Sequence, residues 1–66
     1  MLKIKNEKIK IAMANAGLNI SDLAKIYGCT SHRMWAIING TRASTKTVGR
    51  LAKALGCDVL DIIDTN

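Results

Sequence analysis

The sequence predicts an all-α fold, a bundle of five short helices within a single domain that spans residues 1–66. Apolar residues recur at helical spacing in successive short segments, and most of these segments follow a good capping residue and stop at glycine. Ala, Ile and Leu dominate the apolar residues, and Phe and Pro are absent. A chain of 66 residues has room for a small core but little room for a cleft built from several layers.

The first two helices are defined by an apolar face and by the glycine that ends each of them. The inward face of the first helix consists of Ile9, Ala12, Met13 and Ala16. Gly17 ends this helix, Asn19 caps the second, and Gly28 ends the second. The inward face of the second helix consists of Leu23, Ala24 and Tyr27. Residues 1–5 alternate like an edge strand, but so short a segment also fits an N-terminal arm or the lead into the first helix.

The third helix follows the second after a short turn. Thr30 caps it, and it covers about residues 31–38 before Asn39 and Gly40 close it. Its inward side chains are Met34, Ile37 and Ile38. The stretch "LAKIYGCTSHRMWAII" is thus a short helix, a turn that begins with Gly28, and another short helix. This pattern predicts a helix-turn-helix, in which the later helix is free to enter a major groove of DNA.

The fourth and fifth helices follow the same rules. Ser44 caps the fourth helix and Gly56 ends it. Its inward side chains are Val48, Leu51, Ala52 and Leu55. Asp58 caps a short fifth helix, and Asp61 is favourable in its first turn because helix N-termini attract negative charge. The inward side chains of the fifth helix are Val59, Ile62 and Ile63.

The charge of the chain is strongly positive and unevenly distributed. Ten Lys and Arg against five Asp and Glu give a net charge of +5. All ten basic residues lie within residues 1–57. The charged residues within 58–66 are all acidic. A compact basic domain is typical of proteins that bind a polyanion, most often nucleic acid.

The sequence also predicts a cytoplasmic protein that does not enter a membrane. The first ten residues are too charged to contain the apolar part of a signal peptide. No apolar run approaches the roughly 20 residues that a membrane-spanning helix needs. The two cysteines therefore indicate reduced thiols.

Four stretches together resemble the Cro/cI-type helix-turn-helix transcriptional regulators, also called the xenobiotic-response-element type. They are "AGLNISDLA" leading into the second helix, "YGCTSHRM" across the turn, "ING" at the end of the third helix, and "VGRLAKALGCDVLDII" over the last two. The resemblance runs from about Ile9 to Ile63. It implies a lambda-repressor-like fold of five helices, binding of double-stranded DNA through the third helix, a homodimer on a palindromic operator, and transcriptional regulation.

The resemblance also implies roles for individual residues. Family members commonly contact bases from the positions of Ser31, His32, Trp35 and Ala36. They commonly contact phosphates from the positions of Asn19, Ile20, Asn39, Thr41 and Arg42. This chain departs from the family at Ile20, where the family often has Gln. An isoleucine side chain cannot bind phosphate, so the side-chain contact of the family is not expected at this position. The chain also has Met13 and Ile38 where the family often has an ion pair, and replacing both charges together can be neutral or stabilising.

The face of the third helix that is predicted to point outward contains the same four positions, Ser31, His32, Trp35 and Ala36. Arg33, near the start of the helix, can reach guanine or a phosphate, or remain solvated. His32 either contacts DNA or is a bystander. A large ring at Trp35 is unfavourable in water, so it lies either against thymine methyls in the groove or against protein, within this chain or in another subunit.

The loop after the third helix is polar and basic, and it suits phosphate. Side chains and backbone amides of Asn39, Thr41, Arg42 and Ser44 can position the DNA backbone without reading sequence. Lys46, in the first turn of the fourth helix, is electrostatically unfavourable unless a polyanion is near. Leu60 and Ile63 are candidates for a dimer interface.

We expect no enzyme activity, metal, cofactor or small-molecule ligand. Cys29 and Cys57 occupy positions where small apolar residues fit, and one histidine with two dispersed cysteines does not make a zinc site or a catalytic pair. Two functions remain. The first is sequence-specific DNA binding by a transcriptional repressor, and the second is a protein-interaction module on the same fold that uses Trp35.

Overall fold

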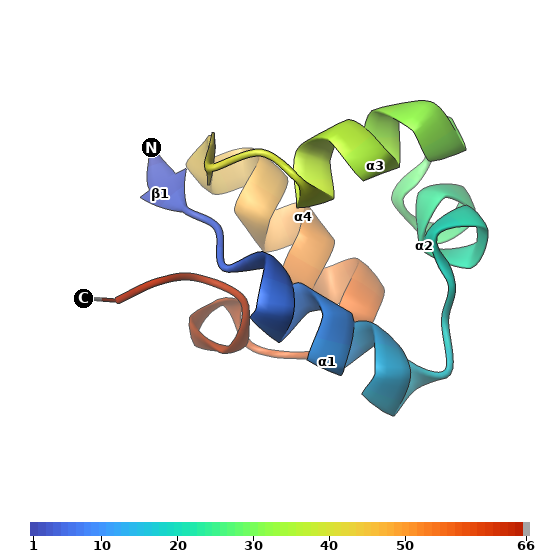
Figure 1. Cartoon of the computed structure of the whole chain (residues 1–66), viewed down its shortest axis with the longest axis horizontal. Coiled ribbons are helices and arrows are strands. Elements are labelled where there is room, and N and C mark those ends of the chain that lie inside the picture. Colours follow the sequence, from blue (N-terminus) through green and yellow to red (C-terminus); the bar gives the residue numbers. More distant parts are fainter. Residues whose placement is uncertain (66) are drawn as a thin grey trace.

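Four α-helices and a short terminal turn build the domain in the computed structural model, which describes residues 1–65 (Figure 1). The elements are, in order, β1 (Leu2–Lys3), α1 (Asn6–Ala16), α2 (Ile20–Tyr27), α3 (Ser31–Ile38), β2 (Arg42–Ala43), α4 (Thr45–Leu55) and η1 (Val59–Asp61). Helix α4 packs against α1, α2 and η1, and α3 packs against α2. The helix-turn-helix formed by α2 and α3 therefore rests on α4.

The predicted helix starts are confirmed, because each capping side chain accepts a backbone hydrogen bond from the first turn. Asn19 Oδ1 accepts from the N–H of Asp22 at 2.8 Å, and Asp22 Oδ2 accepts from the N–H of Asn19 at 3.2 Å. Thr30 Oγ1 accepts from the N–H of Arg33 at 3.1 Å. Ser44 Oγ accepts from the N–H of Thr47 at 3.2 Å. These bonds satisfy N–H groups that have no partner within their helix. The sequence thus sets the start of α2, α3 and α4 locally.

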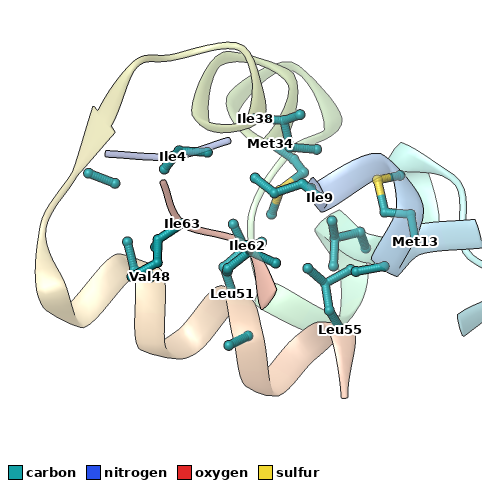
Figure 2. Close-up of a cluster of buried hydrophobic side chains, with 14 of the residues drawn as sticks. Ile4, Ile9, Met13, Met34, Ile38, Val48, Leu51, Leu55, Ile62 and Ile63 are labelled. Carbon is teal, nitrogen blue, oxygen red and sulfur yellow. The ribbon is translucent and has the colours of Figure 1, made fainter. Parts of the chain in front are cut away.

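The core is wholly apolar within the described residues. Its fully buried side chains are Ile9, Leu23, Met34, Ile38, Val48, Leu51 and Ile62. Met13 and Ile38, at the positions where the family often has an ion pair, both belong to this cluster. Figure 2 shows Ile4 and Ile63 from the two ends of the chain among the side chains of the helices. The two ends of the chain are therefore part of the core.

The fifth predicted helix is not confirmed, because η1 is one turn of 3-10 helix. Its predicted cap is present: Asp58 Oδ1 accepts from the N–H of Leu60 at 2.9 Å, and Asp61 Oδ2 accepts from the N–H of Asp58 at 3.1 Å. The turn stops because Ile62 and Ile63, which follow it, are buried in the core, where Ile63 forms a bridge with Ile4 of the N-terminal segment. A capping pattern therefore starts a turn here that the core contacts do not allow to continue.

The ends of the chain and the loop before α4 form a small ribbon, so the fold is not purely helical. Strand β1 pairs antiparallel with β2, with Leu2 opposite Ala43 and Lys3 opposite Arg42. On the other side of β1, the N–H of Lys5 donates to the carbonyl of Ile62 and the N–H of Asp64 to the carbonyl of Lys3, both at 3.0 Å. We call residues 2–5, 41–43 and 62–64 the terminal ribbon. Of the alternatives for residues 1–5, the strand is the one found.

Candidate nucleic-acid interface

Helix α3 has one buried face and one exposed face, as its apolar periodicity predicts. Met34 and Ile38 are buried in the core. The exposed side chains of α3 are Ser31, His32, Arg33, Trp35 and Ala36. Because α2 packs against one side of α3 and the cap at Thr30 fixes its start, the opposite face of α3 is presented at the surface. The residues that the sequence analysis assigned to base contacts thus share one accessible surface.

Trp35 is 55% exposed, which excludes the alternative that it packs into the core of this chain. Its backbone carbonyl accepts a hydrogen bond from Asn39 Nδ2 at 2.9 Å. This bond turns the Asn39 amide toward the C-terminal end of α3. The ring is one of several large apolar side chains that are exposed in this chain, with Ile11, Ile26 and Leu60.

Arg33 and Arg42 line the same shallow pocket, of about 270 Å³, between α3, β2 and the start of α4. Gly40 and Ser44 also line it. A Cβ atom at Gly40 would meet the carbonyl oxygens of Ala36 and Ile37 at 3.3 and 3.4 Å, so the chain turns tightly here. The sequence indicates two separate arginine contacts, but the fold brings Arg33 and Arg42 to one concave surface.

Some of the expected phosphate-binding side chains are already engaged as helix caps. Ser44 Oγ donates to Thr47 Oγ1 at 2.9 Å while it accepts from the Thr47 N–H. Asn19 Oδ1 is likewise occupied by the cap of α2. The side chains of Asn19 and Ser44 therefore fix helix starts. The N–H groups of the first turns that have no partner within their helix remain available to an anion. Thr41, Arg42 and Lys46 are exposed on the same stretch.

A family model described as the Cro/C1-type HTH DNA-binding domain matches residues 8–66. The chain belongs to this family. The resemblance inferred from the four sequence stretches is therefore confirmed, and with it DNA binding as the activity of the domain. No curated protein matches the chain.

One contact that joins the helix-turn-helix of this Cro/C1-type domain to α4 was not predicted from the sequence. Arg50 Nη2 on α4 donates to the carbonyl of Tyr27, the last residue of α2, at 2.8 Å. The same guanidinium lies over the Tyr27 ring, 4.4 Å from its centroid. The bond satisfies a carbonyl at the end of α2 and joins the helix-turn-helix to α4. No local pattern indicates this pair, because the two residues are far apart in the sequence.

The two candidate dimer residues differ sharply in exposure. Leu60 on η1 is 61% exposed, whereas Ile63 is only 8% exposed and packs into the core (Figure 2). Ile63 packs into the core of this chain, where its bridge to Ile4 turns it inward, so Leu60 is the more accessible of the two candidates. Lys8 Nζ donates to the Ile63 carbonyl at 3.2 Å, which fixes this segment further.

The two thiols of the Cro/C1-type domain are free and half-buried. Burial raises the pKa of Cys57 above its ordinary value of 9.0, and the nearby carboxylates of Asp61 and Asp58 raise it further. A protonated thiol behaves as a small apolar group rather than as a nucleophile. Within residues 1–65, no His, Cys, Asp and Glu side chains gather in a group of three that could hold a metal. No helix in this part of the chain could cross a membrane.

Proposed function

We propose that this protein is a cytoplasmic transcriptional repressor that binds double-stranded DNA sequence-specifically with α3 in the major groove. The observation that supports this most directly is the exposed face of α3, which carries polar, basic and aromatic groups opposite the buried Met34 and Ile38. A helix presented in this way fits the width of a B-DNA major groove.

In this proposal five exposed side chains of α3 contact base edges: Ser31, His32, Arg33, Trp35 and Ala36. Arg33 can donate two hydrogen bonds to guanine, the commonest specific contact in the major groove. Ser31 and His32 offer shorter polar groups, and the apolar surfaces of Trp35 and Ala36 suit thymine methyls. The face therefore favours a site that combines guanine with thymine.

The phosphate contacts come from the starts of α2 and α4 and from the loop between α3 and α4. They are assigned to Asn19, Asn39, Thr41, Arg42, Ser44 and Lys46. Because Asn19 and Ser44 already cap helices, we assign their contacts chiefly to the backbone amides beside them. A bound phosphate also removes the electrostatic objection to Lys46 in the first turn of α4.

A single module of this size buries too little surface for tight specific binding. We therefore propose a homodimer on two half-sites about one helical turn apart. The exposed Leu60 on η1 is the residue assigned to the dimer contact. In Figure 1, η1 lies on the opposite side of the molecule from α3, which leaves the DNA-binding face free.

Selection of bound sequences from a random DNA pool tests the proposal. We expect a palindrome whose half-sites are about one helical turn apart. Recovery of no common sequence would overturn sequence-specific binding. The same operator, placed across a promoter, is expected to lower transcription in a purified system when the protein is added, and an increase would contradict the repressor role.

The exposure of Trp35 also supports a second candidate, a protein-interaction module that docks a partner on α3. The salt dependence of binding separates the two. Binding to DNA weakens steeply with salt because phosphate contacts release counterions, whereas an apolar protein contact changes little. On DNA, Trp35→Ala is expected to alter the preferred sequence.

A further inference from the structure

The register of the terminal ribbon places two positive charges face to face. Lys3 on β1 is directly opposite Arg42 on β2, and both side chains are exposed. Like charges directly opposite each other in an antiparallel pair are destabilising. Within residues 1–65, neither side chain makes a hydrogen bond or an ion pair. The free protein therefore carries a local repulsion on this surface.

The packing of the ribbon does not require these charges. Successive side chains of a strand point to opposite faces, so Leu2 and Ile4 share the face that meets the core while Lys3 points away from it. Ala43, opposite Leu2, is buried on the same inner face. Uncharged residues at positions 3 and 42 would preserve this pairing. The two cations are thus a feature of the surface rather than of the fold.

The ribbon adjoins the DNA-binding face. Arg42 lines the pocket of about 270 Å³ that Arg33 of α3 also lines, so α3 and β2 each contribute a basic residue to it. Lys3 extends this basic surface to β1 through its pairing with Arg42. Figure 1 shows α3 and the β1–β2 pair on the same side of the molecule, away from η1. On its other side Lys3 is next to Asp64, whose N–H donates to the Lys3 carbonyl.

We propose that Lys3 and Arg42 together bind a phosphate of the DNA backbone, so that the N-terminal strand is part of the nucleic-acid interface. A phosphate between the two cations turns their mutual repulsion into attraction to a shared anion. This inference rests on the proposed DNA binding and adds a third element, β1, to the helix-turn-helix and the loop. It also assigns a ligand to a surface that the fold alone leaves unexplained.

The two consequences of neutralising Lys3 have opposite signs. In the free protein, Lys3→Gln removes a repulsion, so the melting temperature stays equal or rises. In the complex, the same change removes one phosphate contact. The slope of log Kobs against log salt then falls by about 0.9, and the affinity at 0.1 M salt falls about eightfold, on specific and random DNA alike. A residue needed only for folding would lower stability and binding together.

The experiment measures DNA affinity over a salt series, together with thermal unfolding, for wild type, Lys3→Gln and Lys3→Arg. Lys53→Gln is the matched control, since Lys53 is exposed in the last turn of α4, the end opposite Ser44 and the loop. We expect Lys3→Arg and Lys53→Gln to keep the wild-type slope. Any gain in stability from Lys3→Gln should disappear in an Arg42→Gln background.

The outcomes separate this inference from the proposed function. If the wild-type protein binds no DNA, the proposed function fails and this inference falls with it. If the wild-type protein binds DNA but Lys3→Gln keeps its slope, or matches Lys53→Gln, only the inference is overturned. A fall in melting temperature that accompanies weaker binding in Lys3→Gln would also overturn it, because Lys3 would then be structural.

Discussion

Arg50 holds the last residue of α2 by two contacts at once: a 2.8 Å hydrogen bond from Nη2 to the Tyr27 carbonyl, and a guanidinium 4.4 Å from the centroid of the Tyr27 ring. One side chain thus satisfies an open carbonyl at a helix end and covers an aromatic face. Since α3 packs on α2, this contact also supports the orientation of α3.

Arg50→Ala is expected to lower the free energy of unfolding by about 1–2 kcal/mol, from the loss of a charged hydrogen bond and a cation–π contact near the surface. Arg50→Lys should recover part of this, because an ammonium retains the charge over the ring but not the planar group. Urea unfolding of the three proteins measures the effect. Equal midpoints for Ala and wild type would show that the contact is not stabilising.

Ser44 allows the structural role of a helix cap to be separated from the DNA contact that we propose for it. Ser44→Ala should cost about 1 kcal/mol of stability, because the Thr47 N–H loses its acceptor. Ser44→Asp keeps an acceptor there and should restore stability, but it places a negative charge where we propose a phosphate. We therefore expect Ser44→Asp to be stable and to bind DNA more weakly than Ser44→Ala. The reverse order of affinities would argue against a phosphate at the start of α4.

Leu60 and Ile63 should respond in opposite ways to substitution. Ile63→Ala removes buried side-chain volume and is expected to destabilise the fold by about 2–5 kcal/mol. Leu60→Gln changes an exposed side chain, so it should leave the stability of the monomer unchanged and weaken the proposed dimer. Sedimentation of the two variants with and without operator DNA measures this. A dimer unaffected by Leu60→Gln would place the interface elsewhere.

The raised pKa of Cys57 predicts a loss of stability in alkaline solution. The unfolded thiol ionises near pH 9.0, whereas the folded thiol ionises only at higher pH. The contribution of this group is therefore fully present below pH 9.0 and is lost as the pH rises through the folded pKa. Cys57→Ala should lack this part of the decline, which unfolding curves between pH 8 and 10.5 would resolve. Parallel declines in the two proteins would contradict it.

The parts of the fold that the sequence predicted depend on neighbours along the chain. The caps at Asn19, Thr30 and Ser44 involve residues three positions away, and the buried face of α3 follows from helical spacing. The same local logic failed at Asp58, because its capping pattern serves a 3-10 turn as well as a helix.

The parts that were missed depend on contacts between distant residues. A strand of two residues has no detectable period, so the pairing of β1 with β2 could not be read from "MLKIK" alone. The inward position of Ile63 follows from its bridge to Ile4, and an isoleucine suits a core and an interface equally well. In the candidate site, the exposure of α3 was predictable, whereas the shared pocket of Arg33 and Arg42 required the fold.

The terminal ribbon has a consequence for the order in which the domain assembles. Helices α2, α3 and α4 are neighbours along the chain, so their contacts close short loops early in folding. The ribbon joins the first residues to the last ones, and its few hydrogen bonds close the longest loop in the domain. These bonds should therefore form late and open first, with faster amide exchange at Ile4 and Lys5 than within α4. The loop at residues 41–43, which pairs with β1, should therefore also reach its final shape late.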